Sequence, residues 1–420
     1  MKRIASWGTL CLLVPLFGAG CSDDSSATGA GGSAGSSTAG SAGIGGEGGS
    51  AGSSAGTAGA AGAGGSAGTT AGGTAGQATP DLQNLIETAQ TEIGLPALAG
   101  VVLRSGGIVD QGVSGVRRLS QPDLATLEDH WHIGSNTKAI TATLCAMLVE
   151  DGKLAFDAKL SDLFPEVTGI DLELADVTLE MLLQHRSGIG AYTSRLSISA
   201  IPTDVADDRQ KFAEWLIQEP PATVVGEFNY SNAGYGLVGA ILERASGMTY
   251  EELLDSRLVQ PLGMQSKAWL GWPASTEADQ PWAHWSISGP LQEHPPTDVS
   301  MPLGLSTAGN FSYTLLDYAR FVQLHLRARR GDPQLLNQAS FDKLHTANGD
   351  YAMGWLVATY NGKPLMAHEG SLDGFDAHTV IWPDQDLAMV LVNNAGQNFA
   401  SQPVSKRWLE WSELAWPAAP

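Results

Sequence analysis

A serine and a lysine three positions apart precede an apolar stretch of this sequence. Ser135 is followed by Lys138, and residues 139–149 have the periodicity of a helix. Side chains three apart lie on one helix face, and the first helical turn favours negative charge that develops beside it. A lysine removed from water loses its proton more readily and can act as a base for a serine hydroxyl. The pair predicts a serine nucleophile activated by a lysine, although the same spacing recurs over residues 340–343.

Two further polar motifs lie downstream of this pair. In the first, Tyr230 is followed two residues later by Asn232. A tyrosine beside a serine–lysine pair can pass a proton to a leaving group, and an asparagine can hydrogen-bond a substrate amide. In the second, His368 is followed two residues later by Gly370. A donor side chain followed by glycine suits a strand that lines a site, because glycine lets a substrate approach the backbone closely.

The order of the three motifs resembles that of the β-lactamase-related serine hydrolases. This family contains class C β-lactamases, D-alanyl-D-alanine peptidases, D-amino-acid peptidases and esterases. The resemblance covers roughly residues 80–395 and departs from the family pattern at Arg186, where threonine is usual. The segments that carry it besides the motifs are residues 132–154, 182–188, 261–264 and 317–321.

This resemblance implies a role for each motif residue. Ser135 would attack a carbonyl and form an acyl-enzyme, and Lys138 would take the serine proton. Tyr230 would pass a proton to the leaving group, and Asn232 would hold the substrate. The backbone N–H groups of Ser135 and Ser371 would form the oxyanion hole, so that Ser371 also belongs to the predicted substrate site.

The third motif departs from the family pattern at two positions, which leaves the substrate open. His368 occupies the place where class C β-lactamases carry lysine, and Gly370 completes the motif. Glu369 replaces the usual threonine, and we expect its charge to be a poor neighbour for a substrate carboxylate. The first hypothesis is a hydrolase of D-alanyl peptides or β-lactams. An esterase or amidase acting on another small substrate and a non-catalytic envelope binding protein are the alternatives.

Strand patterns occur at both ends of the region that follows residue 79, with helices between them. Helices are predicted over residues 80–93, 139–149 and 401–415, and strands over residues 98–103, 107–116, 353–360, 379–382 and 388–393. The predicted fold is α+β, with one antiparallel sheet built from both ends of the domain and flanked by helices. A mainly helical region is inserted at roughly 150–345, as in β-lactamases and penicillin-binding proteins. We expect ligands to bind between the two regions.

The N-terminal part has the composition of targeting and linking segments. Residues 1–20 combine a positive start, a short apolar run and small residues, which predicts a secretory signal peptide. Its end resembles the cleavage box of bacterial lipoproteins, which implies a lipid on Cys21, and an ordinary signal peptide is the alternative. Residues 21–78 are mostly Gly, Ala, Ser and Thr and predict a flexible tether. The hydrolase domain is predicted over residues 79–420, anchored in the cell envelope.

The composition argues against several other classes of protein. The net charge of −21 disfavours nucleic acid as a partner. Cys145 is the one cysteine after Cys21, so no disulfide within the domain is predicted. The nine histidines lack the spacing of metal ligands, and the sequence predicts neither a metal nor another cofactor. The expected partners are a small-molecule or peptide substrate and the membrane that holds the lipid anchor.

Four tryptophans gather in a proline-rich stretch: Trp269, Trp272, Trp282 and Trp285. Aromatic rings of this kind can form a binding surface for sugars or apolar acyl groups. They also occur as loop residues that pack onto a core. The sequence leaves both interpretations open.

Overall fold

The computed structural model describes most of the region after residue 78. The described residues are 79–266, 269–271, 279–286, 289–295, 301–396 and 401–419. The predicted signal peptide, the lipidation of Cys21 and the tether lie outside the described residues and stay predictions. Within the described part, the search for a helix long and apolar enough to cross a bilayer finds none.

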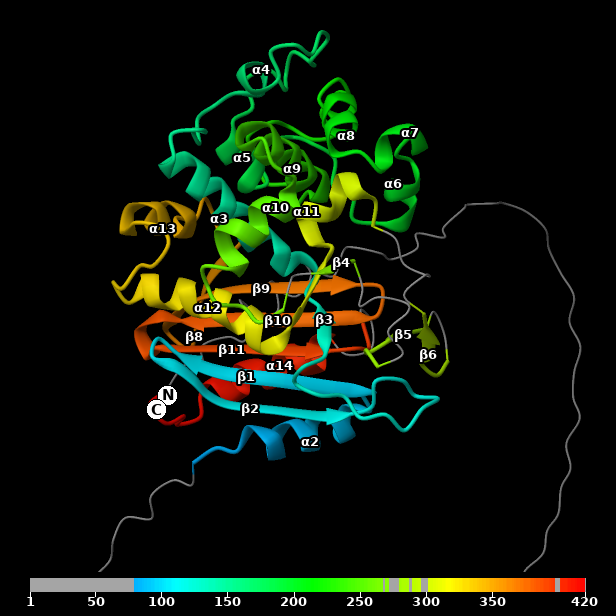
Figure 1. Ribbon diagram of the computed structural model, residues 1–420, viewed down its shortest axis with the longest axis vertical. Coiled ribbons are helices and arrows are strands. Elements are labelled where there is room, and N and C mark those ends of the chain that lie inside the picture. The colour runs from blue at the N-terminus through cyan, green and yellow to red at the C-terminus, as the bar shows by residue number, and fades with distance from the viewer. Residues whose placement is uncertain are drawn as a thin grey trace, which may run out of the picture. The chain divides into compact units, whose positions relative to one another are not determined.

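A six-stranded antiparallel sheet joins the two ends of the domain (Figure 1). Its order is β2-β1-β11-β10-β9-β8, and β1 pairs with both β2 and β11. The strands are β1 (Ala97–Arg104), β2 (Gly107–Gly115), β8 (Leu356–Tyr360), β9 (Lys363–Leu372), β10 (Phe375–Trp382) and β11 (Leu387–Asn393). The predicted antiparallel sheet, built from both ends of the domain, is confirmed.

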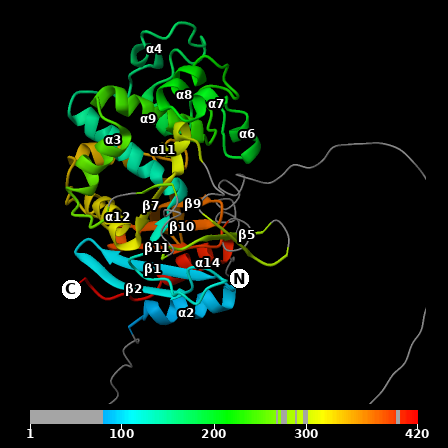
Figure 2. The same ribbon diagram turned by 45° about the vertical axis from the view of Figure 1, so that its right-hand side comes forward.

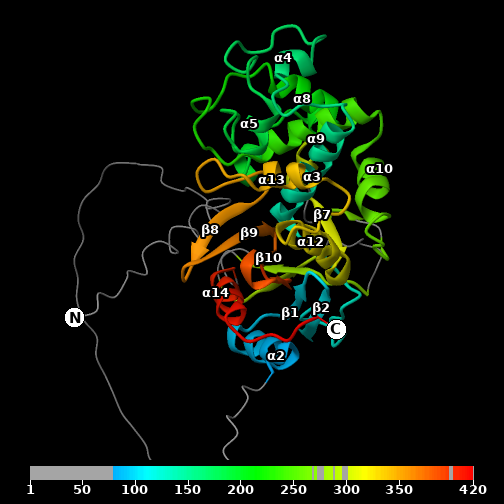
Figure 3. The ribbon, with the colours of Figure 1, turned by 90° about the vertical axis from the view of Figure 1, so that its left-hand side faces the viewer.

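Helices cover both faces of this sheet, so that its central strands are shielded from solvent on both sides. Every residue of β10 and β11 is buried. Helices α2 (Leu82–Ile93) and α14 (Ser401–Ser412) lie on one face, and α12 (Leu315–Arg329) lies on the other (Figure 3). The helical region adjoins the α12 face, as Figure 2 also shows.

The inserted region is mainly helical, as predicted, but it also contributes short strands. Its helices are α3 (Thr137–Glu150), α4 (Leu160–Leu163), α5 (Leu179–Leu183), α6 (Arg195–Ser199), α7 (Thr203–Ala206), α8 (Arg209–Leu216), α9 (Asn232–Ser246), α10 (Tyr250–Leu254), α11 (Ser306–Gly309) and α13 (Gln338–His345). Single turns are η1 (Gly134–Asn136), η2 (Asp255–Val259) and η4 (Leu303–Leu305), and η5 (Pro383–Gln385) connects β10 to β11. Strands β3 (His130–His132), β7 (Phe311–Thr314) and β4 (Trp269–Leu270) form one small sheet, and β5 (Ala283–Trp285) pairs with β6 (Gln292–His294).

The strand that carries the third motif is longer than its sequence indicates. β9 has ten residues, although its lysine, proline, glutamate, glycine and serine have low strand propensity. It lies between β8 and β10 and pairs with both. Pairing on both sides supplies the backbone hydrogen bonds that propensity does not predict.

Helix α3 passes through the core and carries Lys138 in its first turn, directly after the turn η1 that contains Ser135. Residues from Thr137 through Leu148 are all buried. Cys145 lies among them as a free thiol, which confirms its interpretation as a small buried hydrophobe. Burial raises the pKa of this thiol, so it stays protonated at neutral pH. The buried position of α3 removes Lys138 from water.

Helix α9 approaches η4 closely because its glycines have no side chains. A Cβ at Gly236 would lie 2.2 Å from the carbonyl oxygen of Gly304. A Cβ at Gly234, in the same helix, would have its nearest neighbour at 3.5 Å, an ordinary contact. These two positions separate the effect of helix propensity from the effect of close packing.

We expect Gly236→Ala to destabilise the protein and Gly234→Ala to leave it unchanged or slightly more stable. Strain of about 1–3 kcal/mol at Gly236 outweighs a gain in helix propensity of about 1 kcal/mol. Urea unfolding of the two variants measures the difference. Equal stabilities would show that the contact between α9 and η4 relaxes without strain.

Candidate active site

Two glycines hold the turn that carries Ser135 against strand β9. Gly134 has φ +50°, and a Cβ there would lie 2.5 Å from the backbone nitrogen of Ser371. A Cβ at Gly370 would lie 2.0 Å from the carbonyl oxygen of Ile133 and 2.8 Å from the nitrogen of Ser135. Neither position has room for a side chain. The close contact brings the backbone nitrogens of Ser135 and Ser371 to the same place, as an oxyanion hole requires.

Lys138 is fully buried beside Ser135. Its Nζ lies 3.0 Å from Ser135 Oγ, 2.8 Å from Asn232 Oδ1 and 2.8 Å from the carbonyl oxygen of Ala308. Burial lowers the pKa of Lys138 well below its usual value, because the charged form loses its hydration. In its neutral form the amine can accept the hydroxyl proton of Ser135. The structure therefore brings together the two residues that the sequence paired.

Tyr230 contacts both Lys138 and Ser135. The ring centroid of Tyr230 is 4.6 Å from Lys138 Nζ, and that of Tyr235 is 5.6 Å away. Burial raises the pKa of Tyr230, and a hydrogen bond with Ser135 opposes the shift only in part. The phenol is therefore protonated at neutral pH and is suited to donate a proton rather than to accept one.

The segment over residues 189–192 positions Asn232 through backbone groups. The backbone N–H of Asn232 donates to the carbonyl oxygen of Ala191 at 2.8 Å. The side-chain Nδ2 of Asn232 donates to the carbonyl oxygen of Tyr192 at 3.0 Å. Ser231 caps α9 and donates its hydroxyl to the carbonyl oxygen of Gly190 at 2.7 Å. The Asn232 side chain thus faces Lys138 because both of its ends are hydrogen-bonded.

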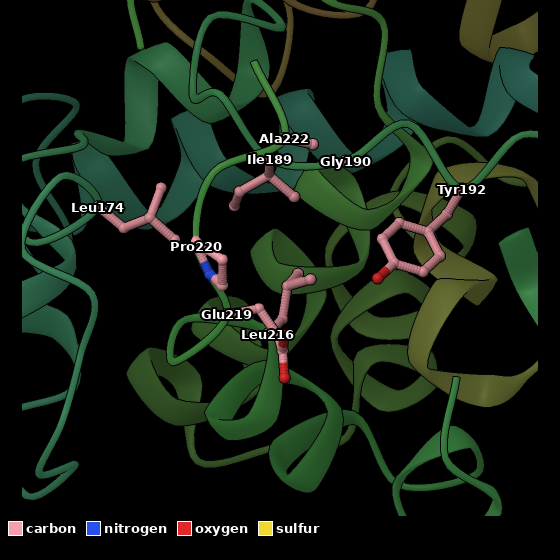
Figure 4. A pocket seen from close by; sticks show the side chains of 8 residues that line it. All are labelled: Leu174, Ile189, Gly190, Tyr192, Leu216, Glu219, Pro220 and Ala222. Carbon is pink, nitrogen blue, oxygen red and sulfur yellow. The ribbon is translucent and has the colours of Figure 1, made fainter. Parts of the chain in front are cut away.

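A small pocket borders this segment on the helical side (Figure 4). Its volume is about 120 Å³, and its lining is mostly apolar. The lining residues are Leu174, Ile189, Gly190, Tyr192, Leu216, Glu219, Pro220 and Ala222. Burial raises the pKa of the Tyr192 phenol, and the charge of Glu219 raises it further. The pocket and the catalytic motif therefore share the backbone of residues 189–192.

His185 supports the same motif, and motif reading of the sequence missed it as a site residue. Its Nδ1 accepts a hydrogen bond from the backbone N–H of Ser231 at 3.1 Å, and its carbonyl oxygen accepts from the Asn229 N–H at 2.7 Å. Its ring centroid is 4.3 Å from that of Tyr230. Burial lowers the pKa of His185 well below its usual value, so the ring is neutral and keeps Nδ1 as an acceptor. The feature of the sequence that could have pointed to His185 is the segment over residues 182–188, which carries part of the family resemblance.

The structure places His368 in a buried position with both ring nitrogens hydrogen-bonded. Its Nδ1 donates to the carbonyl oxygen of Glu369 at 2.7 Å, and its Nε2 accepts from the Tyr351 hydroxyl at 3.0 Å. The residue is 1% exposed. Burial lowers its pKa to about 3, and the charge of Lys138 acts in the same direction. At neutral pH His368 therefore carries no positive charge that could attract a substrate carboxylate.

Glu369 points to the opposite face of the sheet, away from His368. Successive residues of a strand alternate between faces, and Glu369 contacts Ser405 and His378 on the side covered by α14. The expectation that its charge lies beside the substrate is wrong for this reason. The substitution of threonine by glutamate does not add a negative charge at Ser135.

The described tryptophans contact protein side chains. The ring of Trp282 has the Arg118 guanidinium 4.9 Å from its centroid, and that of Trp285 has Arg195 at 4.8 Å. Trp285 also stacks on His294 with ring centroids 4.0 Å apart. These contacts favour the interpretation that Trp282 and Trp285 are loop residues packed onto the protein. Trp272 and the side chain of Trp269 lie outside the described residues.

Comparisons with known proteins identify similar chains and a shared fold. The family model described as Beta-lactamase matches residues 82–408. "Penicillin-binding protein 4" of Amycolatopsis lactamdurans is 27% identical over 75% of this chain and 84% of its own length. "Unguisins hydrolase ungD'" of Aspergillus campestris is 22% identical over 63% of this chain, which spans only 52% of that relative's length. A class C β-lactamase from Rhodobacter sphaeroides has the same fold, with a TM-score of 0.62, 20% identity and coverage of 78% and 97% of the two chains.

Replacement of His185 tests its support of the Tyr230–Asn232 segment. The residue has φ +58°, so glycine and asparagine tolerate its backbone better than alanine. Asparagine also keeps an acceptor near the position of Nδ1, whereas alanine and glycine leave the buried Ser231 N–H unpaired, at a cost of about 1–3 kcal/mol.

We expect the stability order His185→Asn above His185→Gly above His185→Ala in urea unfolding. His185→Gly loses the hydrogen bond but tolerates the positive φ. Its comparison with His185→Asn therefore measures the hydrogen bond, and its comparison with His185→Ala measures the backbone strain. If the asparagine and glycine variants prove equally stable, the hydrogen bond to Ser231 contributes nothing measurable.

Proposed function

This chain belongs to the β-lactamase family of serine hydrolases, and we propose that it cleaves an amide or ester bond through an acyl-enzyme formed on Ser135. The contact between Lys138 Nζ and Ser135 Oγ, 3.0 Å in a site where the lysine is 0% exposed, supports this proposal most directly. A buried amine beside a serine hydroxyl is the arrangement that general-base activation needs.

Acylation begins with proton transfer from the serine to the lysine. Neutral Lys138 takes the hydroxyl proton while Ser135 Oγ forms a bond to the substrate carbonyl carbon. The carbonyl oxygen becomes an oxyanion and accepts hydrogen bonds from the backbone N–H groups of Ser135 and Ser371. The carbonyl oxygen of Ala308 and Asn232 Oδ1 accept hydrogen bonds from the lysine and stabilise its protonated form.

Collapse of the oxyanion breaks the bond to the leaving group and leaves an ester on Ser135. Tyr230 donates a proton to the leaving nitrogen or oxygen and recovers one from protonated Lys138, whose Nζ lies over its ring. A water molecule then attacks the ester, which releases the acid and returns the proton to Ser135. No net proton is gained or lost by the enzyme in this cycle.

A β-lactam or a peptide ending in D-alanine is the first substrate class that we propose. Both contain an amide carbonyl that the Ser135 hydroxyl can attack, so that the serine becomes acylated. The similarity of this chain to a penicillin-binding protein and to a class C β-lactamase supports this class.

An uncharged ester or amide is the second candidate, and the state of His368 favours it. The ring is buried, both nitrogens are hydrogen-bonded, and its pKa is about 3. A substrate carboxylate would therefore find no counter-charge at the place where class C β-lactamases have lysine.

Intact-mass spectrometry of the full chain with benzylpenicillin tests acylation. We expect wild type to gain the mass of the drug or to hydrolyse it, and Ser135→Ala to do neither, because the alanine has no nucleophilic oxygen. If both proteins and the drug stay unchanged, short acyl esters are the next substrates. If wild type reacts with neither substrate class, the remaining hypothesis is a non-catalytic binding protein.

A pair of substrates that differ only in charge separates the two candidates. We expect benzylpenicillin methyl ester to acylate Ser135 at least as fast as benzylpenicillin itself, because neutral His368 offers the carboxylate no counter-charge. Rates of adduct formation, measured by intact mass for both compounds, give the ratio. A rate at least tenfold higher for the carboxylate, about 1.4 kcal/mol, would mean that another group binds it.

A further inference from the structure

A cluster of three polar side chains ties strand β9 to helix α14 on the face of the sheet opposite Ser135. The Ser405 hydroxyl of α14 donates to Glu369 Oε1 at 2.8 Å and lies 3.2 Å from His378 Nδ1. His378, on β10, also pairs with Glu369 Oε1 at 3.6 Å. Glu369 and His378 face each other directly in the register of the two strands. The cluster thus links two strands and one helix.

The geometry of this cluster is that of an anchor and not of a second catalytic triad. In a triad the serine and the acid contact opposite nitrogens of the histidine. Here Ser405 and Glu369 share Nδ1, and Nε2 has no hydrogen-bond partner among the described residues. Ser405 is also only 7% exposed, which leaves a substrate little access.

Opposite charges on Glu369 and His378 hold the cluster together where both groups are ionised. Burial by itself would lower the pKa of His378, but the hydrogen bond and charge of Glu369 raise it above its usual value, and Asp376 adds to this effect. Burial would raise the pKa of Glu369, but His378 and Ser405 hold it below its usual value. The ion pair is therefore present above the lowered pKa of Glu369 and is lost as pH rises through the raised pKa of His378.

Other charged groups near the cluster have their own partners. On α14, Lys406 pairs with Glu410, and Arg407 pairs with Glu410 and with Glu92 of α2. The indole of Trp408 approaches the His378 ring at 6.2 Å between centroids and excludes water from that side. Among the described side chains, Glu369 and Asp376 are therefore the acidic groups that act on His378.

We propose that Glu369 is a positioning residue, which fixes the backbone of Ser371 in the oxyanion hole through its contacts with Ser405 and His378. Strand β9 is held from two sides. Gly134 and Gly370 permit contact with the Ser135 turn on one face, and Glu369 connects the same stretch to α14 on the other. Ser371 follows Glu369 by two residues and opposes Asp376 on β10. This inference rests on the proposed acyl-enzyme function, because it assigns the anchor to that oxyanion hole.

The test is covalent labelling of Ser135 by a fluorophosphonate in the full chain, followed by intact mass. The variants are Glu369→Gln, which keeps the shape and removes the charge, and Ser405→Ala, which removes the donor. Ser412→Ala is the matched control, because Ser412 is a buried serine of α14 whose hydroxyl contacts only its own helix, at Leu409. Thermal melting confirms that each variant is folded.

We expect both anchor variants to label roughly ten- to a hundredfold more slowly than wild type, because small displacements of oxyanion donors reduce rates by such factors. The loss should lie in the maximal labelling rate and not in the concentration for half-maximal rate. The labelling rate of wild type should decline as pH rises through the pKa of His378. In Glu369→Gln this decline should occur at lower pH, because the carboxylate that raises the pKa of His378 is gone. Ser412→Ala should label like wild type.

Two negative outcomes have different meanings. If wild type is not labelled at Ser135, the proposed acyl-enzyme function is wrong and the inference falls with it. If wild type is labelled and folded Glu369→Gln labels at the same maximal rate, the positioning role alone is overturned. Glu369→Gln decides the matter should Ser405→Ala fail to fold.

Discussion

Burial of the Lys138 amine is the constraint on which the rest of the site depends. Helix α3 must pass through the core for this lysine to lose its water, and all three hydrogen-bonding positions around Nζ must then be filled by protein. Ser135, Asn232 and the carbonyl oxygen of Ala308 come from three separate parts of the chain. A base of lowered pKa is therefore obtained only where η1, α9 and α11 meet.

The part of β9 around Gly370 is positioned by opposite kinds of residue on its two faces. Towards Ser135, Gly134 and Gly370 allow the backbones to touch because they lack side chains. Towards α14, Glu369 reaches a serine and a histidine that are both buried. The alternation of side chains along β9 makes this division possible, since neighbouring residues of one motif serve different faces.

Neutral histidines give this site an unusual charge distribution. His185 and His368 are both buried and both have lowered pKa values. Both ring nitrogens of His368 are hydrogen-bonded, and His185 accepts a hydrogen bond at Nδ1. They hold the Tyr230 segment and Tyr351 in place. The family's acyl-transfer chemistry is thus combined with a third motif that offers the substrate no fixed positive charge, which is the physical basis for the second substrate candidate.

The sequence by itself paired Ser135 with Lys138 as a predicted nucleophile and base, and it indicated the outline of the fold. The three-residue spacing recurs over residues 340–343, so this pairing also needed the order of the three motifs, whereas apolar periodicity marks strands at both ends of the domain. The tertiary structure alone decided the direction of Glu369, the hydrogen bond from Ser231 to His185 and the burial of His368. Each of these depends on register or on contacts between residues distant in the chain, and no local pattern encodes which neighbour a side chain will meet.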